Sequence, residues 1–429
     1  VGQATLQAGQ YTWINNGLVS ADVGGQTLNL VNPGGGGQPI QNNGILEAIN
    51  GGRLQLSADV TAATGAQMRA GSGSVIEMNG VRVTGTVNTT GTGSFRANGN
   101  FNNVLSGVTL NGNLDMASVA ASNRISEGLV LNGAISVGSS SILYLDNRST
   151  ATQAISGTGS INLAGGALRM EGTGQTTTGA NITIRGSGTV GQATVLSGQH
   201  TWINNGVVSA DVNGQTLNLV PVANGSQAIQ HNGTMRATGG GTLQIGTDVV
   251  GGAGSRYDVD AGSRILMNGV TLSGVVNQTG TGAIEVSGSF ANLLDASSLT
   301  GRVNMGTSGA SSLRVSNGMV MNGGATINVA GSSVLYFDNR NPAAAAQTVS
   351  GSGQIVMSGG ALRFEGGTST TWGSGVTVRG SGTIGQATAQ SANHTLVNNG
   401  TIIADGGALN IVPIANQGRL NGTGTLRID

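Results

Sequence analysis

A long internal repeat constrains the fold of this chain more than any other feature. Residues 12–30 have the sequence TWINNGLVSADVGGQTLNL, which returns 189 residues later as TWINNGVVSADVNGQTLNL. A third copy, TLVNNGTIIADGGALNI, begins at Thr395, 194 residues after the second. Such spacing is typical of repeat architectures, in which each repeat packs on its neighbours. We therefore predict one continuous rod made of two supra-repeats and a partial third, at residues 1–189, 190–383 and 384–429.

A shorter pattern runs inside each supra-repeat. Five segments open with Asn-Gly, carry Ala four residues after the Gly, and close on two apolar residues separated by one polar residue. The apolar pairs are Leu28/Leu30, Leu54/Leu56, Leu217/Leu219, Leu243/Ile245 and Leu409/Ile411. A period of two places each pair on one face of a strand and the residue between them on the other face. We expect the pairs to be buried, and intervening residues such as Asn29 and Asn218 to be exposed.

Composition supports short strands and tight turns. Gly accounts for 77 of the 429 residues, while 38% are apolar and only 5 are Pro. Strands of three or four residues are too short to be stable alone, but coils stacked about 4.8 Å apart can hydrogen-bond to the coils above and below. The sequence predicts an all-β parallel β-helix, or β-solenoid, with about 20 residues per coil. Gly and Asn at the corners are expected to supply backbone with positive φ.

Charge and Cys content narrow the range of partners. The 18 basic residues, all Arg, balance 18 acidic residues, and Cys is absent. A chain without excess positive charge is a poor candidate for binding nucleic acid or anionic membrane. No run of 18 apolar residues occurs, so no membrane insertion is expected.

The Asn-x-Gly, Ala and Gly-Gly-x-Leu-x-Leu pattern resembles the repeats of filamentous-haemagglutinin-like exoproteins and autotransporter passengers of Gram-negative bacteria. The resemblance covers nearly the whole chain. It implies a right-handed parallel β-helix, secretion to the cell surface or the extracellular medium, and a role in adhesion or the biofilm matrix. The function that we predict is a structural extracellular fibre, adhesin stalk or matrix filament. A polysaccharide-binding or polysaccharide-degrading β-helix is the alternative.

The ends of the sequence suggest a mode of assembly. Val1 to Thr5 fall at the same repeat phase as Val190 and Ile384, whereas Asp429 lies within a third unit. An uncapped coil offers unpaired N–H and C=O groups to another strand. The expected partners are copies of the same chain stacked end to end, or further repeats of a longer array. Cell-surface or matrix polysaccharide is a second candidate partner.

The candidate polar residues favour structural roles, so we predict no catalytic, cofactor-binding or metal-binding residue and no enzymatic activity. The chain's three His residues occupy positions that change between copies and are expected to face solvent; they are His200, His231 and His394. Two Asp-Asn-Arg triplets follow apolar strands and are predicted to be turns, with a metal or sugar site as the alternative; they are Asp146-Asn147-Arg148 and Asp338-Asn339-Arg340. Arg169/Glu171 and Arg363/Glu365 are expected to pair on an outer strand face.

Two Trp residues raise the question of sugar stacking. Trp13 and Trp202 occupy equivalent places in the first two copies, and Leu396 replaces them in the third. An apolar residue at the same position favours packing over sugar binding. No Gly-Gly-x-Gly-x-Asp nonapeptide occurs, so a calcium-loaded repeat is not expected.

Overall fold

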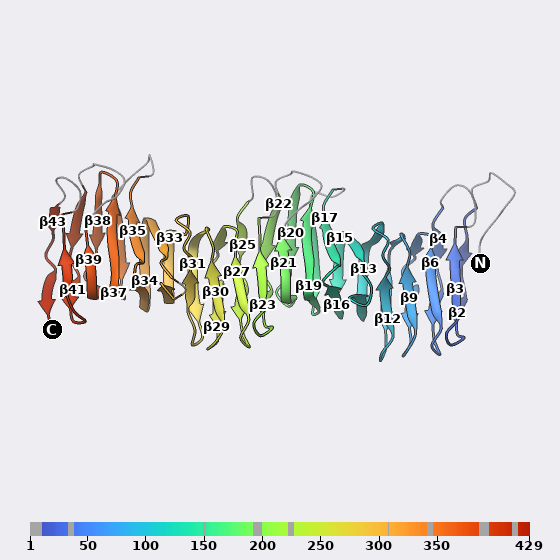
Figure 1. Ribbon diagram of the computed structural model, residues 1–429. Coiled ribbons are helices and arrows are strands. Elements are labelled where there is room, and N and C mark those ends of the chain that lie inside the picture. The colour runs from blue at the N-terminus through green and yellow to red at the C-terminus, as the bar shows by residue number, and fades with distance from the viewer. Residues whose placement is uncertain are drawn as a thin grey trace. The chain divides into compact units, whose positions relative to one another are not determined.

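A computed structural model describes residues 11–32, 38–148, 152–191, 200–221, 227–307, 309–340, 346–385, 394–413 and 419–429. These residues form strands joined by turns, and no helix occurs among them (Figure 1). Strands pair in parallel with strands one turn away, which confirms the predicted β-solenoid. Val1 to Thr5, on which the predicted repeat phase depends, lie outside the described residues.

The chain forms two compact units. Unit 1 comprises Val1–Ser209 and Val220–Gln227, and unit 2 comprises Ala210–Leu219 and Ala228–Asp429. The same short elements recur in both units, because the Asn-Gly segments of the sequence recur.

The strands from Ile14 to Ala210 are β1 (Ile14–Asn15), β2 (Leu18–Ala21), β3 (Thr27–Val31), β4 (Ile40–Asn42), β5 (Ile45–Ala48), β6 (Arg53–Ser57), β7 (Val60–Ala62), β8 (Gln67–Ala70), β9 (Val75–Met78), β10 (Arg82–Val83), β11 (Thr86–Thr89), β12 (Ser94–Ala97), β13 (Asn103–Asn111), β14 (Asn113–Met116), β15 (Ser122–Leu131), β16 (Ala134–Gly138), β17 (Ile142–Asp146), β18 (Thr152–Gly157), β19 (Ser160–Glu171), β20 (Gly174–Thr178), β21 (Thr183–Gly191), β22 (His200–Asn204) and β23 (Val207–Ala210).

The strands from Thr216 to Ile428 are β24 (Thr216–Leu219), β25 (Ile229–His231), β26 (Thr234–Ala237), β27 (Thr242–Ile245), β28 (Val249–Gly251), β29 (Arg256–Val259), β30 (Arg264–Met267), β31 (Thr271–Thr279), β32 (Ile284–Val286), β33 (Leu293–Met305), β34 (Ser312–Ala330), β35 (Val334–Asp338), β36 (Gln347–Gly351), β37 (Gly353–Glu365), β38 (Ser369–Trp372), β39 (Val376–Ile384), β40 (Thr395–Asn398), β41 (Thr401–Ala404), β42 (Leu409–Ile411), β43 (Arg419–Asn421) and β44 (Thr425–Ile428).

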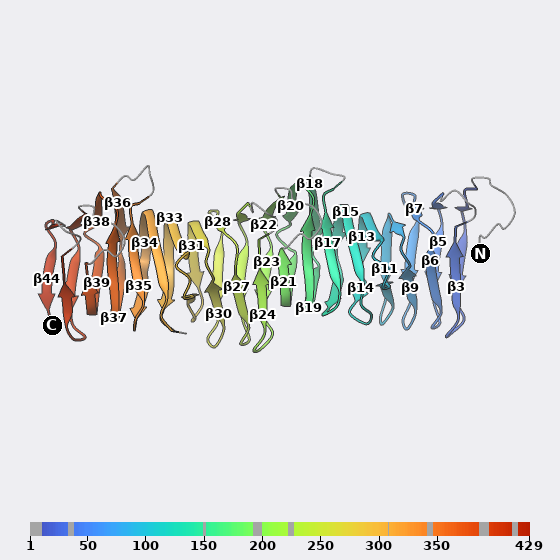
Figure 2. The same cartoon turned by 45° about the horizontal axis from the view of Figure 1, so that its top comes forward.

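The core of unit 1 contains a column of apolar side chains, one from each turn. Register between successive strands aligns Leu28, Leu54, Ile76, Phe95, Leu114, Ile135, Ile161 and Ile184. Figure 2 shows the first strands of this column, β3, β6 and β9, side by side. All members are buried except Leu28, which is partly exposed. Each buried side chain contributes about 1.5–3 kcal/mol by leaving water.

Most members of the apolar pairs are buried as predicted, but Leu28 and Leu409 are partly exposed and Ile411 is 42% exposed. The polar residues Asn29 and Asn218 are more covered than expected. Leu30, Leu217 and Leu219 are fully buried, whereas Asn29 and Asn218 are only partly exposed. The cause is hydrogen bonding between side chains of adjacent turns: the Ser57 hydroxyl donates to Asn29 Oδ1 at 2.9 Å. Stacked polar residues therefore form a ladder along the strand face.

Gly at the Asn-Gly corners serves a purpose that we did not predict. Gly44 does not have positive φ, but a Cβ built on it would lie 2.1 Å from the carbonyl oxygen of Gly17 in the preceding turn. Likewise, a Cβ built on Gly400 would lie 2.2 Å from the carbonyl oxygen of Val376. The prediction of positive φ was wrong here, since Gly is needed for close approach of backbones. Positive φ occurs instead in the second turn, as at Gly25 and Gly214.

Turn length varies around the predicted value because the corner loops differ. Hydrogen-bonded Asn side chains of adjacent turns are 19 residues apart at Asn79 and Asn98, but 27 apart at Asn15 and Asn42. The predicted coil of about 20 residues matches the shorter turns. Longer turns carry their extra residues in loops, and the strands stay in register.

Candidate functional site

A cluster of charged side chains lies where β15, β17 and β19 stack in unit 1. Asp146 ends β17 and is in register with Glu171 at the end of β19. Arg124, on β15, places one guanidinium nitrogen 3.2 Å from Asp146 Oδ2 and 2.7 Å from Glu171 Oε2. Arg148 Nε donates to Asp146 Oδ1 at 2.8 Å. Two cations and two carboxylates thus meet across three turns, and we call these four residues the unit 1 cluster.

An aromatic ring lies against the unit 1 cluster. The guanidinium carbon of Arg124 lies 4.5 Å from the centre of the Tyr144 ring, within the range of a cation–π interaction. Register places Tyr144 between Arg124 on one side and Arg169 on the other. The tyrosine points away from the apolar core, since it alternates with Leu143 and Leu145, and is nevertheless buried.

Electrostatics keep Asp146 ionised. Burial alone would raise the pKa of Asp146, but hydrogen bonds from the side chain and backbone of Arg148, with the charges of Arg148 and Arg124, hold that pKa below its ordinary value. A carboxylate with a lowered pKa and two guanidinium partners is a poor general acid or base near neutral pH. The cluster suits holding turns together.

Unit 2 repeats this cluster with the same residue types. Arg314 contacts Asp338 Oδ2 at 2.5 Å and Glu365 Oε2 at 3.2 Å, and Arg340 contacts Glu365 Oε2 at 2.9 Å. The guanidinium carbon of Arg314 lies 4.9 Å from the centre of the Tyr336 ring. Burial would raise the pKa of Asp338, but hydrogen bonds from Arg340 and the charges of both Arg residues lower it. These four charged residues form the unit 2 cluster.

The Asp-Asn-Arg triplets are turns, as predicted. The Arg148 and Arg340 backbone N–H groups donate to Oδ1 of Asp146 and Asp338, both at 3.0 Å. The Asn147 side chain donates to the Gln175 carbonyl at 2.7 Å. The triplets thus bind their own chain and the adjacent turn.

Glu171 and Glu365 lie on the outer strand face, as predicted, because they are in register with Asp146 and Asp338 and alternate with core residues. Both acids are nevertheless buried there, and they pair with Arg124 and Arg314. Sequence reasoning also missed Arg124 and Arg314 themselves. Arg124 and Glu171 are 47 residues apart, and only the stacking of turns brings them together.

The three His residues are buried, so their predicted solvent exposure was wrong. His231 Nε2 donates to the Arg256 carbonyl at 3.2 Å, and burial lowers the pKa of His231 to about 4. At the equivalent place in unit 1, Asn42 Nδ2 donates to the Gln67 carbonyl at 3.3 Å. The position varies between Asn and His because either side chain reaches the same carbonyl. Variation between copies therefore did not indicate exposure.

His200 and His394 repeat a second arrangement. His200 Nδ1 lies 3.3 Å from the Gly172 carbonyl oxygen, and Nε2 lies 3.0 Å from Thr176 Oγ1. His394 contacts Gly366 and Thr370 in the same way, at 3.2 and 3.1 Å. Burial lowers the pKa of both imidazoles. Each neutral ring links two groups of a neighbouring turn.

Packing explains Trp202, as predicted. Trp202 is fully buried and its indole N–H donates to Thr178 Oγ1 at 3.2 Å; Leu396, its counterpart, is also buried. Trp13, at the equivalent place in the first copy, is partly exposed.

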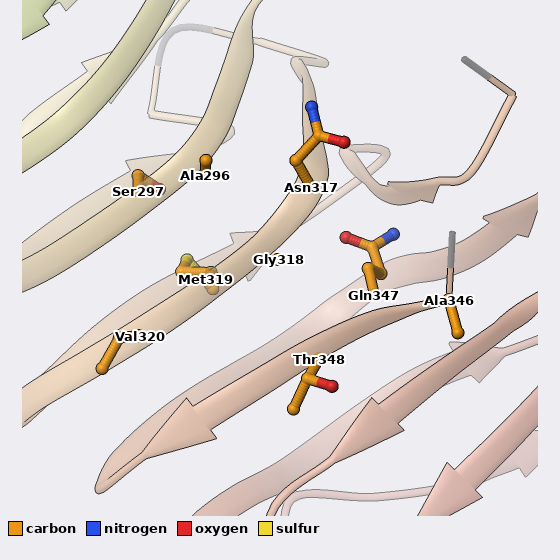
Figure 3. Close-up of a pocket in the computed structure, with 9 residues that line it drawn as sticks. All are labelled: Ala296, Ser297, Asn317, Gly318, Met319, Val320, Ala346, Gln347 and Thr348. Carbon is orange, nitrogen blue, oxygen red and sulfur yellow. The ribbon is translucent and has the colours of Figure 1, made fainter. Parts of the chain in front are cut away.

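A surface pocket of about 420 Å³ lies in unit 2 beside a β-bulge. Figure 3 shows its lining on three successive segments: Ala296 and Ser297, Asn317 to Val320, and Ala346 to Thr348. The register of β33 against β34 shifts between Asp295 and Ser297. Among the described residues that line the pocket, none is charged.

Backbone strain and a buried hydroxyl mark the same bulge. Ala296 and Asn317 have φ of 44° and 55°, a conformation that costs side-chain-bearing residues free energy. Asn317 Nδ2 donates to Asp295 Oδ1 at 2.7 Å, which holds the bulge. Ser297 is buried, and its hydroxyl has no hydrogen-bond partner among the described residues.

Within the described ranges, no group of three or more His, Cys, Asp or Glu side chains is close enough to hold a metal ion. None of the described residues forms a helix long and apolar enough to cross a membrane. No known protein family matches the chain, and no curated protein sequence matches it.

Proposed function

We propose that this protein is a structural element of an extracellular fibre, adhesin stalk or biofilm-matrix filament at the surface of a Gram-negative bacterium. The observation that carries the proposal is the repetition of the polar cluster in both units. Three ion pairs recur between counterparts in the two units: those of Arg124 with Asp146 and Glu171, and that of Arg148 with Asp146. A scaffold that must be stiff along its length requires the same internal fastening in each repeat.

The chemistry of the clusters supports a non-catalytic role. Hydrolases and lyases of polysaccharides require an acid and a base whose pKa values are poised for proton transfer. Asp146 and Asp338 instead have lowered pKa values and donors of their own chain on both oxygens. Their charges are used for holding turns together, which is the function expected of a fibre.

Solenoid geometry also supports assembly with copies of the same chain. Every turn directs backbone N–H and C=O groups along the stacking direction, as in the pairing of β28 with β31. The same pairing between copies would extend the stack without a new type of contact. We propose copies of this chain as its principal partners.

Electron microscopy of the purified chain tests the proposal. We expect filaments many times longer than a single chain, and immunogold label on the outside of intact cells that express the full-length gene. Particles that remain single at all concentrations, together with label confined to the cell interior, would contradict it. Release of reducing sugar or unsaturated product from a panel of polysaccharides would favour the enzymatic alternative instead.

A further inference from the structure

Two phenylalanines are exposed at equivalent places in the two units. Phe101 is 70% exposed and Phe290 is 67% exposed, whereas the other Phe residues of the chain, Phe95, Phe337 and Phe364, are fully buried. The exposed pair lies in matching six-residue loops, Asn98–Asn103 and Ser287–Asn292, which are 189 residues apart. A single exposed apolar side chain is ordinary at a protein surface, so the informative feature is that the ring recurs at the same place in both units.

Each loop is held in place by one buried amide. Asn103 Nδ2 donates to the carbonyl oxygens of Asn98 and Asn100 at 3.2 and 2.8 Å, and Asn103 Oδ1 accepts from the Gly80 N–H at 2.8 Å. The exposed ring is therefore presented by an ordered loop, and binding through it costs little conformational entropy.

Asn292 makes the same bonds in unit 2. Its Nδ2 donates to Ser287 and Ser289 carbonyls at 3.1 and 2.9 Å, and its Oδ1 accepts from the Gly269 N–H at 2.7 Å. The two loops thus share one construction.

Between the two loops, the residues beside the Phe differ in type, whereas the Phe itself is the same. The first loop has the sequence NGNFNN and the second SGSFAN, so the loops share only Gly, Phe and the buried Asn. The Asn keeps the loop folded. The Phe is not needed for packing, because most of its surface is in solvent. Its retention beside changed neighbours indicates a role at the surface.

We propose that these two Phe loops bind neutral polysaccharide by stacking of a sugar ring on Phe101 and Phe290. The C–H bonds on one face of a pyranose ring carry partial positive charge, and the face of an aromatic ring is negative. Amide and hydroxyl side chains flank the rings, as Asn102 flanks Phe101 and Ser289 flanks Phe290, and such groups bond to sugar hydroxyls. The six residues of each loop carry no charge, which favours a neutral over an acidic polymer. The Arg314 guanidinium donates to the Phe290 carbonyl at 3.3 Å, but its charge is already paired with Asp338 and Glu365.

The size of the exposed aromatic site favours a sugar over a protein partner. A specific protein–protein interface buries about 1,200–2,000 Å² in total, far more than one ring can supply. A sugar ring needs only one exposed aromatic ring to stack on, and each loop supplies one. This proposal does not depend on the assembly of the chain into a fibre.

Binding to immobilised dextran, galactomannan and mixed-linkage β-glucan tests the proposal, with alginate as the acidic control. We expect the wild-type chain to bind at least one neutral polymer, and F101A/F290A to bind it at least about tenfold more weakly, a change of about 1.4 kcal/mol. Each single variant should have an intermediate affinity. The variant F101W/F290W should bind at least as tightly as wild type, because Trp also stacks.

Two controls separate ring stacking from general apolarity. V23A/V212A removes another exposed apolar pair at equivalent positions and should bind like wild type. F101L/F290L keeps apolar volume without a ring and should bind as weakly as F101A/F290A. Circular dichroism and thermal unfolding should match wild type for all variants, since surface changes alter stability by about 0.5 kcal/mol or less.

Several outcomes would overturn the proposal. They are the absence of binding to every neutral polymer, undiminished binding by F101A/F290A, and full binding by F101L/F290L. Sedimentation velocity supplies one more: if wild type self-associates and F101A/F290A does not, the rings serve contacts between copies of the chain and the assignment to polysaccharide is wrong.

Discussion

The charged clusters of the two units have remained alike, whereas the bulges beside them have diverged. Arg124 and Glu171 have counterparts of the same type in Arg314 and Glu365. At the bulge, Val108 of unit 1 corresponds to Ser297 of unit 2. Other bulge positions differ as well: Gly107 corresponds to Ala296, and Glu127 to Asn317.

The difference between cluster and bulge has an energetic cause. Each member of the cluster satisfies a buried partner, so a single substitution leaves a charge in a poorly solvated place. Ala296 and Asn317 of unit 2 are exposed at the edge of a surface pocket, where a change of side chain costs less. The buried charge network is therefore retained between the units, whereas the bulge positions have changed.

The largest expected effect is that of breaking a cluster. Arg124→Met keeps most of the side-chain volume but removes the cation 2.7 Å from the buried Glu171, and Arg314→Met does the same for Glu365. Losing one partner of a buried pair costs about 3–5 kcal/mol. We expect both variants to lower the free energy of unfolding by similar amounts in urea titrations.

Arg53→Met is the matched control for the cluster variants. Arg53 is 42% exposed and lies 3.7 Å from Glu77, so its loss should cost about 0–1 kcal/mol. If Arg53→Met and Arg124→Met lower stability equally, the clusters are ordinary surface pairs. If only one of the two cluster variants is destabilised, the units are not equivalent.

The next largest expected effect is on the free energy of unfolding in acid, and it involves His231, which stands where unit 1 has Asn42. The pKa of His231 is lowered to about 4 in the fold, against about 6.5 when unfolded. As pH falls, the unfolded chain protonates His231 before the folded chain does. The contribution of His231 to the free energy of unfolding is therefore fully present well above pH 6.5 and is lost as pH falls toward 4. At pH 5 the loss from His231 is about 2 kcal/mol, at about 1.4 kcal/mol per pKa unit.

His231→Asn should remove this loss and leave stability at pH 8 nearly unchanged, because Asn42 makes the same bond in unit 1. Urea unfolding of wild type and His231→Asn at pH 8 and pH 5 measures the loss of stability in each protein. The variant should be less sensitive to acid than wild type, although His200 and His394 still contribute. An identical decline in both proteins would mean that His231 is not buried in solution.

The smallest expected effect is that of exchanging the bulge residues. Ser297→Val replaces an unpartnered buried hydroxyl with the apolar residue of unit 1 and should stabilise the protein by about 1 kcal/mol. The reverse change, Val108→Ser, should destabilise it by about 1–3 kcal/mol. Thermal melts measure both.

Ser297→Ala separates the two causes, since it removes the hydroxyl without adding volume. If Ser297→Val stabilises and Ser297→Ala does not, filling the pocket is the source of the gain. If Ser297→Val destabilises the protein, the Ser297 hydroxyl has a hydrogen-bond partner in solution. Val108 and Ser297 would then not be interchangeable between the two bulges.

Local chemistry was sufficient for much of the fold. The period-two alternation of Leu28, Asn29 and Leu30 predicts a strand with one apolar face, and the recurrence of that pattern predicts stacking. Alternation is read from neighbouring residues and recurrence from comparing one segment of the chain with another, so neither signal requires a structure. Burial of Trp202 and the turn conformation of Asp146-Asn147-Arg148 were predictable for the same reason.

Contacts between turns were not predictable in this way. They include Arg124 with Glu171, 47 residues apart, and the close approach of Gly44 to Gly17. Which residues meet depends on the register of one turn on the next and on loops that make adjacent turns differ in length, from 19 to 27 residues at the Asn ladders. The sequence by itself determined that the strands stack and which face of each is apolar, because alternation is local. Only the tertiary structure decided which polar groups pair and which His residues are buried, because those contacts require the summed length of every turn between them.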